Sequence, residues 1–133
     1  MPRASVEIEI PLHDVDLTGV GWHGHVYKYF EHARTELFRR VGLDIPDMKA
    51  AGVRVVITET RSRHRKPLQY GETITVQATS KVFSRAVQVD YVITNAAGEE
   101  AVRGRTMLAP TSSDGGQIVP LPDVIRTRLE DTP

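Results

Sequence analysis

Residues 14–36 read DVDLTGVGWHGHVYKYFEHARTE and place an acidic, glycine-rich loop directly before an amphipathic helix. From about residue 25 onward the apolar residues recur at the spacing of one helix face: Val26, Tyr29, Phe30, Ala33, Leu37 and Val41. Gly42 suits the C-terminal cap, so the sequence predicts a helix of about four to five turns. A carboxylate beside a helix N-terminus can act on a carbonyl group that the helix end polarises.

Strand patterns lie on both sides of this helix. Val6, Ile8 and Ile10 alternate with glutamates before it, and β-type runs follow it at residues 53–60, 72–82, 86–94 and 100–109. A short helical turn is possible at 47–51, and a C-terminal helix is expected at 123–129. We therefore expect one α+β domain over residues 1–133, a long helix packed on a five-stranded or larger antiparallel sheet. One helix cannot cover both faces of such a sheet, so we expect self-association.

The composition restricts the possible functions. The chain has 133 residues, with 17 Lys and Arg and 17 Asp and Glu, so its formal net charge is +0. A neutral total argues against a nucleic-acid-binding protein, and the lack of Cys excludes a thiol nucleophile and a disulfide framework. The N-terminal residues lack the apolar segment of a signal peptide, and no run approaches the roughly 20 apolar residues of a membrane span. We expect a cytoplasmic protein without a membrane partner.

Several motifs occur together in one register. Asp14, Asp16, Gly19, Trp22 and His23 precede the helical segment FEHARTE at residues 30–36, and the segments KPLQYGE (66–72) and VPLP (119–122) follow. In these positions the chain resembles the hotdog-fold acyl-CoA thioesterases of the 4-hydroxybenzoyl-CoA thioesterase and YbgC type. The chain departs from the family pattern at Val15, His25 and Val26. The family places these residues beside the acyl group, so the acyl preference stays open.

The resemblance implies an enzyme that hydrolyses an acyl-CoA to a free acid and CoA, with water as co-substrate and no cofactor. It makes Asp16 the catalytic acid, as nucleophile or general base, and it assigns the oxyanion to the backbone amides of His23 and Gly24. The His23 side chain is a further catalytic candidate, since imidazole titrates near neutrality. Residue types alone also fit an Asp16 that only caps the turn. Glu31 is the reserve candidate, because another hotdog subgroup uses a helical glutamate.

Basic residues suggest contacts with the phosphates of CoA. The dense run at residues 61–66 (RSRHRK) and the basic turn at 81–85 give five candidates, Arg63, Lys66, Lys81, Ser84 and Arg85. A solvated charged face explains each of these residues equally well. Histidines 13, 23 and 25 suggest a metal site. His23 and His25 form a His-x-His pair, but no third ligand lies at a recognisable spacing from it, so we expect no metal.

Two other functions stay open at this point. A hotdog hydratase or dehydratase would use a His–acid pair, for which Asp16 and His23 are available, and a non-catalytic acyl-CoA or acyl-carrier binding module would use the same pocket. The resemblance also implies an acyl tunnel between protomers, near Asp16 of one and residues 56–60 of the other. A homodimer is then the minimum unit, and a homotetramer is expected.

Overall fold

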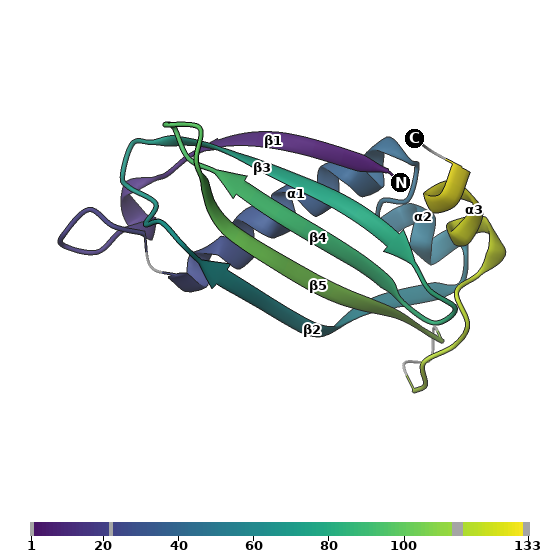
Figure 1. Ribbon diagram of the computed structural model, residues 1–133. Helices are drawn as coiled ribbons and strands as arrows, with labels where there is room; N and C mark the ends of the chain where they lie inside the picture. Colours follow the sequence, from purple (N-terminus) through teal and green to yellow (C-terminus); the bar gives the residue numbers. More distant parts are fainter. Residues whose placement is uncertain (1, 22, 113–115, 132–133) are drawn as a thin grey trace.

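The computed structural model describes residues 2–21, 23–112 and 116–131 of a single α+β chain (Figure 1). Trp22 of the family motif lies outside the described residues, as does most of the segment 112–116, whose Ser, Asp and Gly residues predict a loop. The elements in chain order are β1 (Arg3–Glu9), η1 (Leu12–Asp14), η2 (His23–His25), α1 (Val26–Arg40), α2 (Ile45–Ala50), β2 (Val53–His64), β3 (Thr73–Val82), β4 (Val87–Thr94), β5 (Glu100–Ser112) and α3 (Asp123–Asp131). The predicted long helix and five strands are confirmed.

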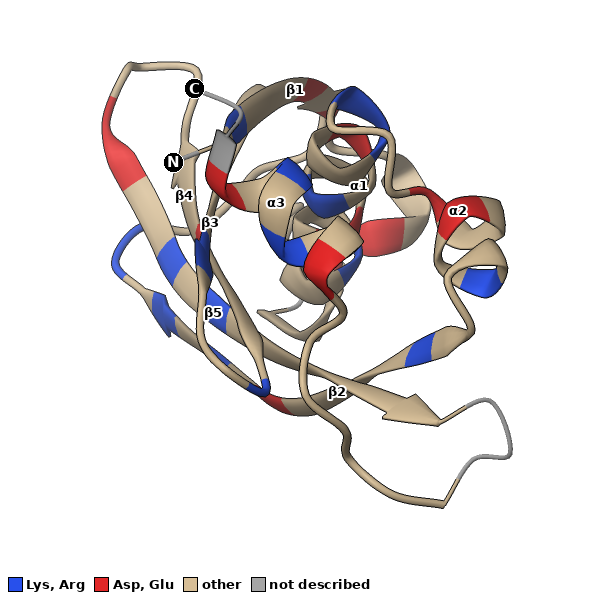
Figure 2. Ribbon diagram, turned by 90° about the vertical axis from the view of Figure 1, so that its right-hand side faces the viewer, with Lys and Arg blue, Asp and Glu red and all other residues tan. Residues whose placement is uncertain are grey.

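All strand pairs of the five-stranded sheet are antiparallel, and the strand order is β1-β3-β4-β5-β2. β4 alternates strictly between buried and half-buried side chains, as expected for a strand with one face on the core. Figure 2 shows the three α-helices gathered on one side of the curved sheet. No helix in the described part of the chain is long and apolar enough to span a membrane.

α1 packs its apolar face on the sheet. The buried residues of α1 are those that the helical spacing predicted: Val26, Tyr29, Phe30, Ala33 and Leu37. The ring of Phe30 lies parallel to the ring of Tyr91 on β4, with centroids 4.2 Å apart and an interplanar angle of 6°. Phe30 also fills the space above Gly104 of β5, where any Cβ atom would overlap its ring. These two contacts of Phe30 fix the position of α1 relative to the sheet.

Several element boundaries differ from the expectations by a few residues, including those of β2 and α2. β2 continues to His64 instead of ending near residue 60, because the second half of the strand keeps its pairing with β5 as far as Val102. Residues 61–64 of the basic run therefore belong to β2. The possible turn after the long helix is the helix α2, which begins at Ile45 because Asp44 and Asp47 form a reciprocal capping box.

We predict that Gly104→Ala destabilises the fold by about 2–4 kcal/mol, because the new methyl group meets the Phe30 ring and the Arg61 carbonyl, the latter at 3.0 Å. Denaturant unfolding measures the change. Gly116→Ala is the matched control, since no atom of the described residues lies within 4 Å of a Cβ atom there. A Gly104→Ala protein as stable as the wild type would show that α1 is not held at this point.

Candidate active site

Asp16 lies in a tight loop that its own side chain stabilises. Its carboxylate oxygen Oδ1 accepts hydrogen bonds from the Thr18 amide at 2.8 Å, the Thr18 hydroxyl at 2.5 Å and the Val20 amide at 3.3 Å. Those bonds from Thr18, aided by the Val20 amide, hold the pKa of Asp16 below its usual value. These hydrogen bonds come from residues of the same loop, and the side chain is otherwise exposed.

Asp14, two residues earlier, is in a different environment. Its side chain is only 2 % exposed, and it accepts hydrogen bonds from the Lys28 ammonium and the Tyr29 hydroxyl, each at 2.6 Å. Burial raises the pKa of Asp14, but the bonds from Lys28 and Tyr29 outweigh it and leave that pKa below the ordinary value. Because both donors are on the first turn of α1, Asp14 fixes the loop against the helix.

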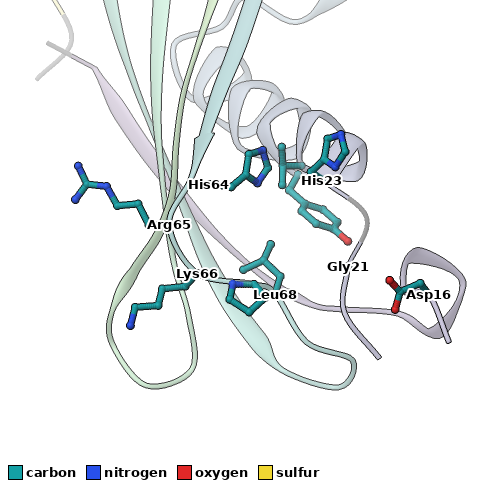
Figure 3. Close-up of a pocket in the computed structure, with 10 residues that line it drawn as sticks. Asp16, Gly21, His23, His64, Arg65, Lys66 and Leu68 are labelled. Carbon is teal, nitrogen blue, oxygen red and sulfur yellow. The ribbon is translucent and has the colours of Figure 1, made fainter. Parts of the chain in front are cut away.

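Asp16 and His23 line one cavity of about 400 Å³ beside the N-terminus of α1 (Figure 3). Leu68 and Tyr29 supply apolar surface, and His64 at the end of β2 lines the same cavity. The His23 and His64 rings stand nearly perpendicular, with centroids 5.8 Å apart and an interplanar angle of 79°. Gly24, expected beside the oxyanion, is the middle residue of the η2 turn and is absent from the lining.

The basic candidates do not form one site. Lys66 lines the cavity and forms an ion pair with Glu99 at 3.2 Å, and Arg63 is exposed on β2 near the same end of the sheet. The other three candidates, Lys81, Ser84 and Arg85, flank the β3–β4 turn at the opposite end of β4. A strand of 8 residues spans about 26 Å. One chain therefore cannot place both groups on the same phosphate.

The helical candidate Glu31 lies apart from Asp16. It lines a larger groove, of about 1070 Å³, bounded by α1, α2 and the first half of β2. Its neighbour Arg34, which the family motif also includes, donates a hydrogen bond to the Tyr91 hydroxyl at 3.1 Å. Arg34 therefore supports the aromatic stack beneath the helix. Among the described residues, no cluster of His, Asp and Glu side chains is arranged to hold a metal ion.

Sequence reasoning missed His64 and its neighbour Ser62. The oxygen of the Ser62 hydroxyl lies 2.8 Å from His64 Nε2. The same hydroxyl group donates a hydrogen bond to the Tyr27 hydroxyl at 3.2 Å. The signal was present in the alternation of the basic run: positions 62 and 64 share the strand face opposite to that of Arg61 and Arg63.

A family model described as the thioesterase-like superfamily matches residues 10–129. The chain belongs to this superfamily and is a thioesterase with the hotdog fold.

Similar proteins include enzymes that act on CoA thioesters. The chain is 25% identical to a 1,4-dihydroxy-2-naphthoyl-CoA hydrolase of Thermosynechococcus vestitus, over 90% of this chain and 84% of the relative. It is 31% identical to YneP of Bacillus subtilis, whose acyl-CoA thioesterase activity is inferred, over 73% of this chain and 71% of YneP. The crystal structure of a Staphylococcus aureus DHNA-CoA thioesterase matches with a TM-score of 0.82 and 29% identity, covering 91% of this chain and 82% of that one.

We predict that Asp14→Asn lowers the free energy of unfolding at pH 7 by about 1–3 kcal/mol, because it replaces a charged acceptor for Lys28 and Tyr29. The folded-state pKa of Asp14 is depressed, so its stabilisation is present above the unfolded pKa and is lost as the pH falls below about 4. Urea unfolding from pH 7 to pH 3 measures whether the free energies of unfolding of Asp14→Asn and of the wild type become equal at low pH. The exposed Glu7→Gln on β1 is the control; a difference independent of pH would contradict the assignment.

Proposed function

We propose that this enzyme hydrolyses an acyl-CoA to a free carboxylic acid and CoA, as a member of the 4-hydroxybenzoyl-CoA thioesterase and YbgC type. The observation that carries the proposal is the cavity that Asp16 and His23 share at the N-terminus of α1. An anionic group and a helix N-terminus bordering one cavity provide a nucleophile or base and a positive potential for the developing oxyanion.

Asp16 has the properties that the reaction requires. Its pKa is depressed, so it is ionised at neutral pH, and it is exposed to the cavity. The three hydrogen bonds described for its carboxylate all end on Oδ1, so we assign the reaction to Oδ2. A thiolate is a good leaving group, and a carboxylate of modest basicity can therefore attack the thioester directly or remove a proton from water.

His23 begins the η2 turn that leads directly into α1. In our proposal its backbone N–H, at the positive end of these two joined helical segments, faces the thioester oxygen in the transition state, as the family resemblance implies. One donor of this kind contributes about 3–4 kcal/mol to catalysis. The His23 ring lines the cavity and contacts the substrate or the attacking water.

CoA thioesters are the substrate class that the relatives suggest, and the reaction needs only water as co-substrate. In our proposal Lys66, at the mouth of the cavity, contacts a CoA phosphate from the same chain. We include aromatic acyl groups among the candidate substrates because similar proteins act on 1,4-dihydroxy-2-naphthoyl-CoA. Acyl chains of other kinds and carrier-protein thioesters belong in the same panel of substrates.

We predict that Asp16→Asn lowers kcat for acyl-CoA hydrolysis by about 100-fold or more while the protein stays folded. The assay follows thiol release from short, long, branched and aromatic acyl-CoAs, with the exposed Asp123→Asn of α3 as the matched control. Full activity of Asp16→Asn would contradict the catalytic assignment. Binding of acyl-CoA without turnover by the wild type would indicate a binding module, and hydration of an enoyl-CoA would indicate a hydratase.

We propose that the enzyme is a homodimer at minimum, paired along β2, and that two such dimers form a homotetramer. β2 is at the edge of the sheet, so one side of its 12 residues has no partner strand in the described chain. The adjacent groove has apolar lining that includes Phe38, Met48, Val55, Ile57 and Leu108. Ile57 is 52% exposed, which is unusual for a large apolar residue on a strand.

We predict that Ile57→Asp converts the dimer into a monomer, because a charge on this edge must be desolvated when two copies pair. Light scattering after size-exclusion chromatography measures the mass. Val124→Asp on α3 is the matched control, since Val124 is also apolar and 47% exposed but is distant in sequence and lies on another element. An unchanged mass for Ile57→Asp would place the interface elsewhere.

A further inference from the structure

Three side chains from two elements form a hydrogen-bonded chain beside the cavity. Ser62 donates to the hydroxyl of Tyr27 on α1 at 3.2 Å, and its oxygen lies 2.8 Å from Nε2 of His64. A serine hydroxyl has one proton, so with this proton directed to Tyr27 the bond between Ser62 and His64 uses the proton on Nε2. This tautomer leaves Nδ1 of His64 as a proton acceptor.

The position of His64 would allow its Nδ1 to accept a proton inside the cavity. It lines the cavity that Asp16 and His23 also line, and Figure 3 shows its ring beside the His23 ring, with Asp16 on a separate loop. Partial burial, together with the nearby His23, lowers the pKa of His64, which keeps its imidazole neutral at pH 7. The side chains of Arg65 and Lys66 point away from the two imidazoles in the same view.

We propose that His64 is a second catalytic residue, the general base that activates water in the second half of the reaction, and that Ser62 is its positioning residue. This inference rests on the proposed thioesterase function. It divides the chemistry between two groups: Asp16 acts as the nucleophile, and His64 handles the proton of the hydrolytic water.

Asp16 Oδ2 attacks the thioester carbonyl, the C–S bond breaks, and its electron pair leaves with the CoA thiolate, which gives a mixed anhydride on Asp16. Water then attacks the acyl carbonyl while His64 Nδ1 takes its proton; the anhydride C–O bond breaks and restores the Asp16 carboxylate. The resulting imidazolium gives its proton to the thiolate, so the products are a carboxylic acid and CoA, and His64 is neutral again.

If Asp16 is the nucleophile and His64 the general base, the kinetics should show a feature that a purely structural role of His64 would not produce. Removing the base slows hydrolysis of the anhydride but not its formation, so His64→Gln should release about one thiol per active site in a fast burst. Steady-state turnover should then be about 100-fold or more below that of the wild type. Rapid mixing of enzyme with acyl-CoA in excess, followed by thiol detection, measures both phases. A slow variant without a burst would overturn the proposal.

The pH dependence of kcat gives a second test. The titratable and charged groups around His64 are His23 of the η2 turn, Tyr27 of α1, the adjacent Arg65 and Lys66, and Asp16 across the cavity. We expect kcat of the wild type to fall as His64 becomes protonated below pH 6.5, and this fall should persist in His23→Gln and vanish in His64→Gln. Loss of the acid limb in His23→Gln alone would overturn the assignment to His64.

Ser62→Ala tests the positioning role, with an expected loss of about tenfold in kcat, little change in KM, and a displaced acid limb. Glu7→Gln is the control, since Glu7 is exposed on β1, at the sheet edge opposite to β2. Thermal unfolding confirms that each variant is folded. A wild type that releases no thiol from any thioester would overturn the proposed function itself; an active wild type with an equally active His64→Gln would overturn only the role of His64.

Discussion

The whole arrangement depends on one close contact, the Phe30 ring of α1 lying against Gly104 of β5. With no side chain at position 104 the ring reaches the sheet and stacks on Tyr91, and Arg34 holds the Tyr91 hydroxyl from the same helix. Two aromatic side chains and a glycine thus set the height and position of α1. Since the first turn of α1 borders the cavity, this contact in the core also determines where a substrate carbonyl would meet the helix N-terminus.

Two carboxylates only two residues apart have separate tasks because their surroundings differ. Asp14 is buried and neutralised by Lys28, so it connects the loop to the helix and has no access to a substrate. Asp16 is exposed, and its described hydrogen bonds come from backbone and hydroxyl groups of its own loop. A carboxylate held by Lys would be a poorer nucleophile, so the loop stabilises Asp16 through neutral donors, in keeping with a reacting group.

The local pattern of apolar residues was sufficient to predict the fold, but it was not sufficient to predict the contacts in the site. The residues of α1 that face the sheet follow a helical spacing visible in the sequence, and the buried residues of β4 follow an alternation that is also visible there. The partners of Asp14 arise where the loop meets α1, and no local period encodes such contacts. The two basic groups look alike in sequence, yet the length of β4 separates Lys66 from Arg85 within one chain.

The proposed pairing of two copies and the proposed role of His64 depend on the same strand. Ser62 and His64 lie on β2, whose inner side contacts β5 and whose outer edge would pair with a second copy. An edge strand with one partner opens more readily than a strand with two, because fewer backbone hydrogen bonds must break. Pairing along β2 would therefore hold the bond between Ser62 and His64 in its productive geometry. In this view self-association stabilises the catalytic base even though Asp16 and His64 line a cavity within one chain.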